Sequence, residues 1–266
     1  MAPRRKSSGP RREPKALAVR HFAKLDRERA RRVGVPEVIL GEGKSIDQLL
    51  EIVAALSERK LGALISRPTP AQLRALRAWR PARPRAPIPR FLAEDRVVRL
   101  PGPLGPRYRN GVVALLTGGT SDVLLAEEAR AVLVALGIRV VRAYDVGVAG
   151  LHRLLSAVRR LEAHRPEVYL VFAGREGALP TVVAGLVAAP VVGVPTSVGY
   201  GRGGGGEAAL NAMLQSCAPL AVVNIDAAVP AALFAAQRFA ERPALRSKAR
   251  PGRRRRPEPG RGRPVP

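Results

Sequence analysis

Short apolar segments alternate with longer helix-forming segments across residues 110–241. The apolar runs are continuous, so both faces of each strand are expected to be buried, which is typical of a parallel sheet covered by helices on both sides. With right-handed crossovers, the pattern predicts a doubly wound, flavodoxin-like α/β domain. The predicted strands are 112–116, 138–143, 168–172, 191–194 and 220–225, and the predicted helices are 121–136, 151–163, 179–187, 207–216 and 231–241.

A smaller α/β domain is predicted ahead of this sheet, over residues 16–80. Helical spacing of apolar residues predicts a solvated first helix over 16–33, with Gly34 as its stop. Strands are predicted at 36–40 and 61–66, and helices at 46–56 and 70–79, with Ser45 as the N-cap of the former. Residues 81–109 are rich in proline and arginine and are interpreted as a linker. The basic ends, 1–15 and 242–266, are predicted to be disordered tails.

The net charge of +25 is distributed unevenly. Residues 110–241 carry ten basic and ten acidic side chains, so the excess lies in the tails and the N-terminal half. No aromatic residues interleave the basic tails, so nucleic acid is not the expected partner. A single cysteine excludes an internal disulfide, and no signal-like or membrane-spanning apolar segment occurs. We expect a soluble, cytoplasmic protein.

Three strand-to-helix turns are expected to meet at the carboxyl edge of the parallel sheet, where ligands of such folds bind. In the first, the backbone at Gly118 and Gly119 can approach an anion at a helix N-terminus, or Ser121 and Asp122 merely cap that helix. The second carries Glu176, which suits a cationic ligand or a general base, or only compensates a helix dipole.

The third turn, residues 195–206, contains six glycines, and either cradles phosphate or is simply flexible. Cys217 follows a predicted helix, whose C-terminus does not activate a thiol, so it reads as a small buried residue or as a nucleophile activated by other means. His152 follows another strand and is a candidate for the same crevice. Lys44 follows two glycines and precedes a helix, and is either a phosphate ligand or a surface lysine.

Five ordered segments resemble one family, LarB, the carboxylase/hydrolase that begins synthesis of the nickel-pincer nucleotide cofactor. Its C-terminal domain is similar to PurE, the aminoimidazole ribonucleotide mutase. The segments are Gly119-Thr120-Ser121-Asp122, residues 144–153, residues 173–180, residues 194–201, and Ser216-Cys217 through Asn224-Ile225-Asp226. Residues 25–44 resemble the N-terminal signature of the same family.

The resemblance implies carboxylation of nicotinic acid adenine dinucleotide by CO2 and release of AMP, giving pyridinium-3,5-biscarboxylic acid mononucleotide. It implies that Cys217 is the nucleophile and Glu176 the carboxylate beside the ring. It implies no tightly bound cofactor, leaves a Mg2+ requirement open, and suggests a homo-oligomer, an octamer as in PurE. The predicted substrate-binding residues are Gly118, Gly119, Thr120, Ser121, Asp122, His152, Gly174, Gly177, Thr196, Ser197, Gly199, Tyr200 and Gly201.

Two departures from the family pattern leave other functions open. Residues 227–230 replace a Gly-Phe-Gly-like turn, and Pro230 stiffens that segment. PurE has a histidine in its glycine-rich turn where this chain has Ala178 or Leu179, which argues against PurE activity. The alternatives are a PurE-like carboxylase or mutase that does not need Cys217, and a non-catalytic protein that binds adenine nucleotides.

Overall fold

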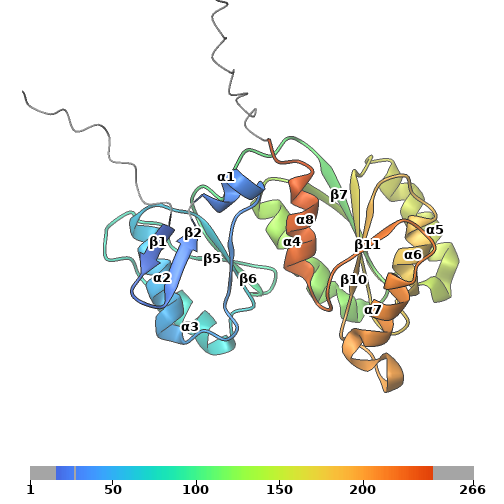
Figure 1. The fold of residues 1–266 in the computed structure, drawn as a ribbon, viewed down its shortest axis with the longest axis horizontal. Coiled ribbons are helices and arrows are strands. Elements are labelled where there is room, and N and C mark those ends of the chain that lie inside the picture. Colours follow the sequence, from blue (N-terminus) through green and yellow to red (C-terminus); the bar gives the residue numbers. More distant parts are fainter. Residues whose placement is uncertain (1–15, 27, 242–266) are drawn as a thin grey trace, which may run out of the picture.

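A computed structural model describes residues 16–26 and 28–241, so the two predicted basic tails lie outside the described residues. The larger domain contains a five-stranded, wholly parallel sheet in the order β11-β10-β9-β7-β8 (Figure 1). This order is the doubly wound, flavodoxin-like arrangement that the sequence predicts. Its strands are β7 (Val112–Thr117), β8 (Arg139–Ala143), β9 (Val168–Ala173), β10 (Val191–Pro195) and β11 (Leu220–Val222).

Helices cover both faces of this sheet, as continuous apolar strands require. Helices α4 (Val123–Ala135) and α8 (Ala228–Gln237) share one buried cluster, whereas α5 (Leu151–Glu162), α6 (Ala178–Ala184) and α7 (Glu207–Leu214) share another on the opposite face. The 3-10 helices η1 (Thr120–Asp122), η2 (Val148–Gly150) and η3 (Gly201–Gly206) precede α4, α5 and α7. All five helix predictions for this domain are therefore confirmed, with shifts of a few residues at their ends.

The smaller domain begins with a hairpin and is built on a four-stranded sheet in the order β3-β4-β6-β5. Its elements are β1 (Ala16–Val19), β2 (Ala23–Asp26), α1 (Arg29–Val33), β3 (Val38–Leu40), α2 (Ile46–Glu58), β4 (Ala63–Ser66), α3 (Pro70–Ala78), β5 (Arg90–Leu92) and β6 (Val97–Leu100). Ser45 caps α2 as predicted, through a capping box with Gln48.

Two sequence predictions for this half of the chain are wrong. Residues 16–33 form the antiparallel β1–β2 hairpin followed by the short helix α1, because Leu17 and Val19 alternate with exposed residues and Arg20 turns the chain with a φ of 45°. Residues 81–109 are not wholly a linker, since β5 within them pairs with β6, and β6 pairs with β4. The small domain therefore extends to Leu100, the last residue of β6.

The two domains are in direct contact. The small domain lies beside the face that α4 and α8 cover (Figure 1), and Val35, Leu64 and Val97 belong to the same buried cluster as these helices. Arg67 and Arg96 of the small domain reach the fully buried carboxylate of Glu128 on α4. Apolar packing and two partly exposed arginines on one buried carboxylate therefore join the small domain to the larger one.

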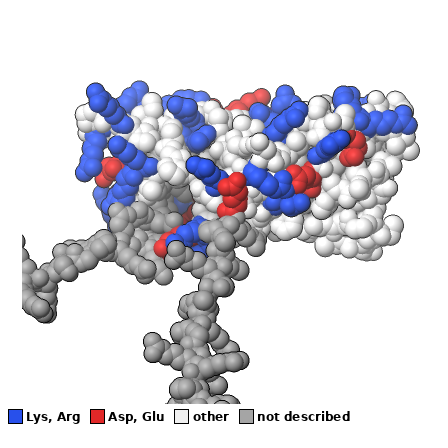
Figure 2. Space-filling model, turned by 90° about the horizontal axis from the view of Figure 1, so that it is seen from above, with Lys and Arg blue, Asp and Glu red and all other residues white. Residues whose placement is uncertain are grey.

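Charge is spread broadly over the surface. Figure 2 shows one face on which Lys and Arg side chains extend across both domains, with fewer acidic groups between them. The charge excess within the described residues belongs to the N-terminal half, since residues 110–241 are balanced. Among residues 16–26 and 28–241, no helix is both long and apolar enough to span a bilayer.

Candidate functional site

A cavity of about 630 Å³ lies at the carboxyl edge of the parallel sheet. It is formed by the turns that follow β7, β8 and β9, with Val198 contributed by the segment after β10. Because β8 lies on one side of β7 and β9 on the other, the cavity is at the topological switch point of the sheet. The lining residues are Gly118, Gly119, Thr120, Ser121, Asp122, Asp145, Gly147, Val148, Ala149, Ala173, Gly174, Arg175, Glu176, Ala178, Leu179 and Val198.

Asp122 joins two of the turns around the cavity. Its carboxylate accepts hydrogen bonds from the Gly119 N–H at 2.9 Å and from the Thr196 hydroxyl at 2.6 Å, and the residue is only 4% exposed. Burial raises the pKa of Asp122; the bonds from Thr196 and Gly119 oppose this rise, and the charge of Asp226 adds to it. Asp122 therefore caps its own turn and also connects it to the end of β10.

Glycine is required where these turns approach each other backbone to backbone. A Cβ atom on Gly147 would lie 2.7 Å from the Gly118 carbonyl oxygen, and one on Gly174 would lie 2.2 Å from the Val198 carbonyl oxygen. No side chain fits at either contact. These glycines let four chain segments converge on one small cavity.

The charged groups around the cavity are mostly acidic. Asp145 and Glu176 join Asp122, and Arg175 is the one basic side chain of the lining. Arg175 lies with its guanidinium carbon 5.0 Å from the centre of the Tyr200 ring. Asp145 pairs with Arg153 on α5 at 3.0 Å. A site with this balance favours a ligand that has a cationic portion, while Arg175 can meet an anionic one.

Asp145 and Arg175 are cavity residues that the sequence prediction did not include. Both adopt left-handed backbone conformations, with φ values of 54° and 51°, in turns at the ends of β8 and β9. A usable signal was present for Asp145, because it lies two residues after a predicted strand and so falls at the same edge as the other turns. For Arg175, its position next to Glu176 was the available signal.

Most of the predicted third turn lies outside the cavity lining. Thr196 is fully buried behind it and reaches it only through Asp122, while the Ser197 N–H donates to the Asp226 carboxylate at 2.8 Å. Gly199 packs against the Gly203 carbonyl. Tyr200 is 74% exposed, and Gly201 turns the chain with a φ of 59°. This segment forms the outer wall of the site, and Val198 is its cavity-lining residue.

The structure separates the two residues predicted to be catalytic. Glu176 follows β9 at the carboxyl edge, whereas the exposed Cys217 precedes β11 at the amino edge, three residues before Leu220, which pairs with Val191 at the start of β10. The length of β10 puts about 15 Å between the two edges. Within one chain, Cys217 and Glu176 therefore do not share a site.

Several other residues singled out in the sequence lie outside the cavity lining. His152 is exposed near the start of α5 and is not among the cavity residues, and Gly177 is the left-handed N-cap of α6. The Lys44 ammonium donates to the Leu40 carbonyl at 2.8 Å, as a surface lysine that closes its turn would. Pro230 lies in the first turn of α8 and does not line the cavity. In the part of the chain that the structure describes, no three His, Cys, Asp or Glu side chains cluster to hold a metal ion.

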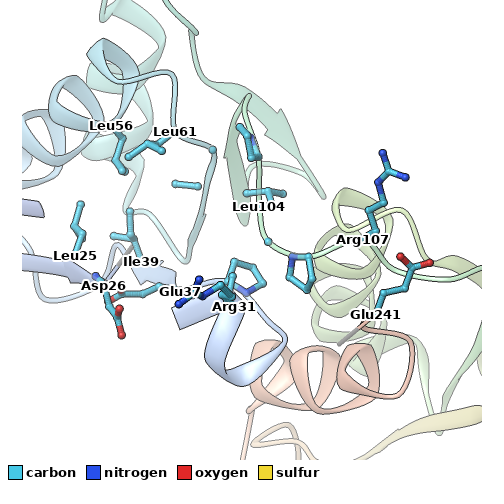
Figure 3. Close-up of a pocket in the computed structure, with 17 residues that line it drawn as sticks. Leu25, Asp26, Arg31, Glu37, Ile39, Leu56, Leu61, Leu104, Arg107 and Glu241 are labelled. Carbon is cyan, nitrogen blue, oxygen red and sulfur yellow. Dashed lines mark hydrogen bonds between the residues drawn. The ribbon is translucent and has the colours of Figure 1, made fainter. Parts of the chain in front are cut away.

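A second cavity, of about 610 Å³, lies between the small domain and the segment that leads to the larger one. Leu25, Ile39 and Leu56 form its apolar wall, with Arg107 and Glu241 on the other side (Figure 3). No predicted site residue lines it, and it has none of the strand-end turns that position polar groups in the first cavity. The cavity at the sheet edge is therefore the candidate active site.

The chain matches two known domains. Residues 112–256 match the AIR carboxylase domain, and residues 17–93 match the LarB/PurE-like N-terminal domain. The chain is 39% identical over 218 residues to an uncharacterized protein of Methanocaldococcus jannaschii, covering 80% of this chain and 82% of that protein. It is 30% identical over 130 residues to the N5-carboxyaminoimidazole ribonucleotide mutase of the same organism, covering 47% of this chain and 76% of the mutase.

Solved structures similar to the chain include two from Treponema denticola. The crystal structure of a PurE2 variant is 27% identical, with a TM-score of 0.40, and the match covers 48% of this chain and 78% of the variant. The crystal structure of PurE is 26% identical, with a TM-score of 0.39, and the match covers 46% of this chain and 78% of that protein.

Proposed function

The chain belongs to the AIR carboxylase family and carries the N-terminal domain of LarB proteins ahead of it, and from this premise we propose that it is a LarB-type carboxylase and hydrolase. The domain pair by itself supports an enzyme of the carboxylase or mutase type. The proposed substrates are nicotinic acid adenine dinucleotide and CO2. The proposed products are pyridinium-3,5-biscarboxylic acid mononucleotide and AMP.

The observation that carries this proposal is the acidic cavity at the glycine-rich turns. A pyridinium ring is a cation, and three carboxylates line this cavity against the single arginine of its lining. Asp122 is held by Thr196 and Gly119, and Asp145 is paired with Arg153, so Glu176 is the carboxylate most open to such a ring. The phosphates of the dinucleotide need positive partners. Arg175 at the same cavity is available for them, whereas the N–H groups of Gly118 and Gly119 in the first turn already donate to Phe172 and Asp122.

In the proposed mechanism Cys217 is the nucleophile and Glu176 is the general base. A pyridinium carbon cannot attack CO2, so the thiolate of Cys217 first adds to the ring and converts it to a neutral enamine. The adjacent ring carbon then forms a bond to CO2, and Glu176 removes the proton from that carbon. Expulsion of the thiolate restores the aromatic ring. Attack of water on the phosphoanhydride completes the reaction and releases AMP.

This mechanism needs Cys217 from a neighbouring copy of the chain. Cys217 is exposed at the opposite edge of the sheet from Glu176, so its thiol is free to enter the cavity of another protomer but not its own. The proposal therefore includes a homo-oligomer in which one copy supplies Cys217 and another supplies the cavity.

The test is turnover of the dinucleotide with ¹³C-bicarbonate, with and without Mg2+, followed by mass spectrometry. Wild type is expected to form AMP and a dicarboxylated mononucleotide carrying one ¹³C. Cys217→Ala and Glu176→Gln are each expected to lose this product. Co-expression of the two variants with different tags, and purification through both, gives hybrid oligomers. If Cys217 acts in trans, about a quarter of the sites in a randomly mixed oligomer are intact.

Three other outcomes would contradict the trans arrangement or favour another function. Hybrids as inactive as the single variants would mean that Cys217 and Glu176 must come from the same chain, against the geometry above. The similarity to the ribonucleotide mutase makes aminoimidazole ribonucleotide carboxylation the second candidate, and that activity would survive Cys217→Ala. Binding of the dinucleotide without any turnover would favour a non-catalytic nucleotide-binding protein.

A further inference from the structure

The small domain has a direct contact with the outer wall of the candidate site. The Arg67 guanidinium, which belongs to the small domain, donates a hydrogen bond to the backbone carbonyl of Asp226 in the larger domain. Its Nε atom lies 3.4 Å from the carboxylate of Glu128 on α4. Arg67 therefore joins the small domain to two different parts of the larger one.

Asp226 is the point at which this contact meets the site. Its N–H donates to the Pro195 carbonyl at the end of β10, and its carboxylate accepts the Ser197 N–H, both at 2.8 Å. Asp226 holds a left-handed conformation, with a φ of 57°, which a non-glycine residue keeps only when its surroundings impose it. The Arg67 bond is one of the contacts that impose this conformation.

The neighbouring contacts carry this restraint to the cavity. Ile225 packs so closely on Gly206 that a Cβ atom there would lie 2.7 Å from the isoleucine methyl group. Gly206 ends the glycine segment that begins after Ser197, so both ends of that segment rest on residues 225–226. The same segment supplies Val198 to the cavity lining.

Arg67 is itself held rigidly. It directly follows β4, with a φ of 50°, and its N–H donates to the Arg96 carbonyl at 2.8 Å. Pro68 and the capping box of Thr69 follow at once, so the backbone has little freedom on either side. A planar guanidinium on this backbone can reach Glu128 and Asp226 together, which a lysine ammonium cannot do.

We infer that Arg67 is a positioning residue through which the small domain holds residues 197–206 in place as the outer wall of the nucleotide site. Its effect on turnover rests on the proposed function, whereas its effect on the wall does not. The two arginines at Glu128 provide a matched comparison. Arg67 and Arg96 have side chains that are each 29% exposed and pair with the same carboxylate, but the contact to Asp226 is made by Arg67.

The test compares full-length wild type, Arg67→Ala, Arg67→Lys and Arg96→Ala by hydrogen exchange of residues 196–206 without substrate. Arg67→Lys keeps the positive charge beside Glu128, so it separates loss of the Asp226 contact from misfolding caused by an unpaired buried carboxylate. Both Arg67 variants are expected to exchange about tenfold faster in this segment than wild type, and Arg96→Ala about as wild type does. In turnover assays the Arg67 variants are expected to raise KM about three- to tenfold with a smaller change in kcat.

Equal exchange rates in Arg67→Lys and wild type would overturn the inference. A positive charge at residue 67 would then hold the wall without the guanidinium bond to Asp226. The inference would also be overturned if Arg96→Ala exchanged as fast as Arg67→Ala. Loss of an ion pair with Glu128 would then be enough to explain the faster exchange in both variants. If wild type does not turn over the dinucleotide, the proposed function fails. The exchange comparison still decides the role of Arg67.

Discussion

Thr196→Val tests whether Asp122 truly joins two turns of the site. Thr196 is fully buried, and its hydroxyl is one of two hydrogen-bond donors to the nearly buried Asp122 carboxylate. Valine has the same shape and no hydroxyl, so the carboxylate keeps only the Gly119 N–H. A hydrogen bond to a charged, buried group is worth about 1.5–3 kcal/mol, and we expect a loss of about 2 kcal/mol in the free energy of unfolding at about pH 8.

The loss is expected to depend on pH in a defined direction. Burial raises the pKa of Asp122, and the Thr196 bond opposes this rise, so Thr196→Val raises the pKa of Asp122 further. A carboxyl group with a raised folded-state pKa gives stability that is present below its unfolded pKa and lost as pH rises through its folded pKa. The variant therefore loses more stability than wild type with rising pH, from the ordinary aspartate range up through its raised pKa.

Urea denaturation at mildly acidic pH and at about pH 8 measures this difference. Thr117→Val is the matched control, because Thr117 is equally buried at the end of β7 in the same sheet but its hydroxyl accepts a bond from the Asp145 N–H, at 3.0 Å. Its penalty is expected to be the same at both pH values. A Thr196→Val penalty that is absent, or equally large at both, would refute the assigned role of Asp122.

Two further substitutions test the packing of the turns and the contact between domains. Gly174→Ala places a Cβ atom 2.2 Å from the Val198 carbonyl oxygen and is expected to abolish turnover, whereas Gly204→Ala meets nothing closer than 3.8 Å and should change kcat/KM by less than about threefold. Glu128→Gln leaves the two partly exposed arginines of the small domain facing a neutral amide and should cost about 2 kcal/mol in urea unfolding. Glu127→Gln, on the same helix but paired within its own domain, should cost less than about 1 kcal/mol; equal losses would contradict the domain-joining role.

The sequence predicted the larger domain well because its strands are buried on both faces. Runs such as residues 168–172 contain no polar residue that could belong to a loop, and the spacing between runs leaves room for one helix each. The small domain has short strands, so its signals are weak. In residues 16–33, Ala18, Phe22 and Leu25 are also spaced as on one face of a helix, which concealed the strand alternation of Leu17 and Val19. Strands β5 and β6 lie among prolines and arginines that favour extended chain.

The sequence also predicted where the cavity lies, but not which side chains contact each other around it. Glycines mark where turns approach each other, so Gly118 and Gly174 were predictable from the strand ends alone. The role of Thr196 was not, because its contact with Asp122 spans 74 residues and depends on the order of the strands. Asp226, the residue that Arg67 contacts, likewise acts through a bond 159 residues apart in the chain.

The Arg67–Asp226 contact links the small domain to a sheet that already has its own core and cavity. The wall formed by residues 197–206 is rich in glycine and has few buried side chains, so it cannot hold one conformation by its own packing. Asp226 holds one end of the wall, and Arg67 reaches Asp226 from a rigid turn in the other domain. From the inferred role of Arg67, we expect ligand binding at this wall and the position of the small domain to be coupled, each changing the free energy of the other by the same amount. The site must be understood as a property of both domains, although every residue that lines it comes from one.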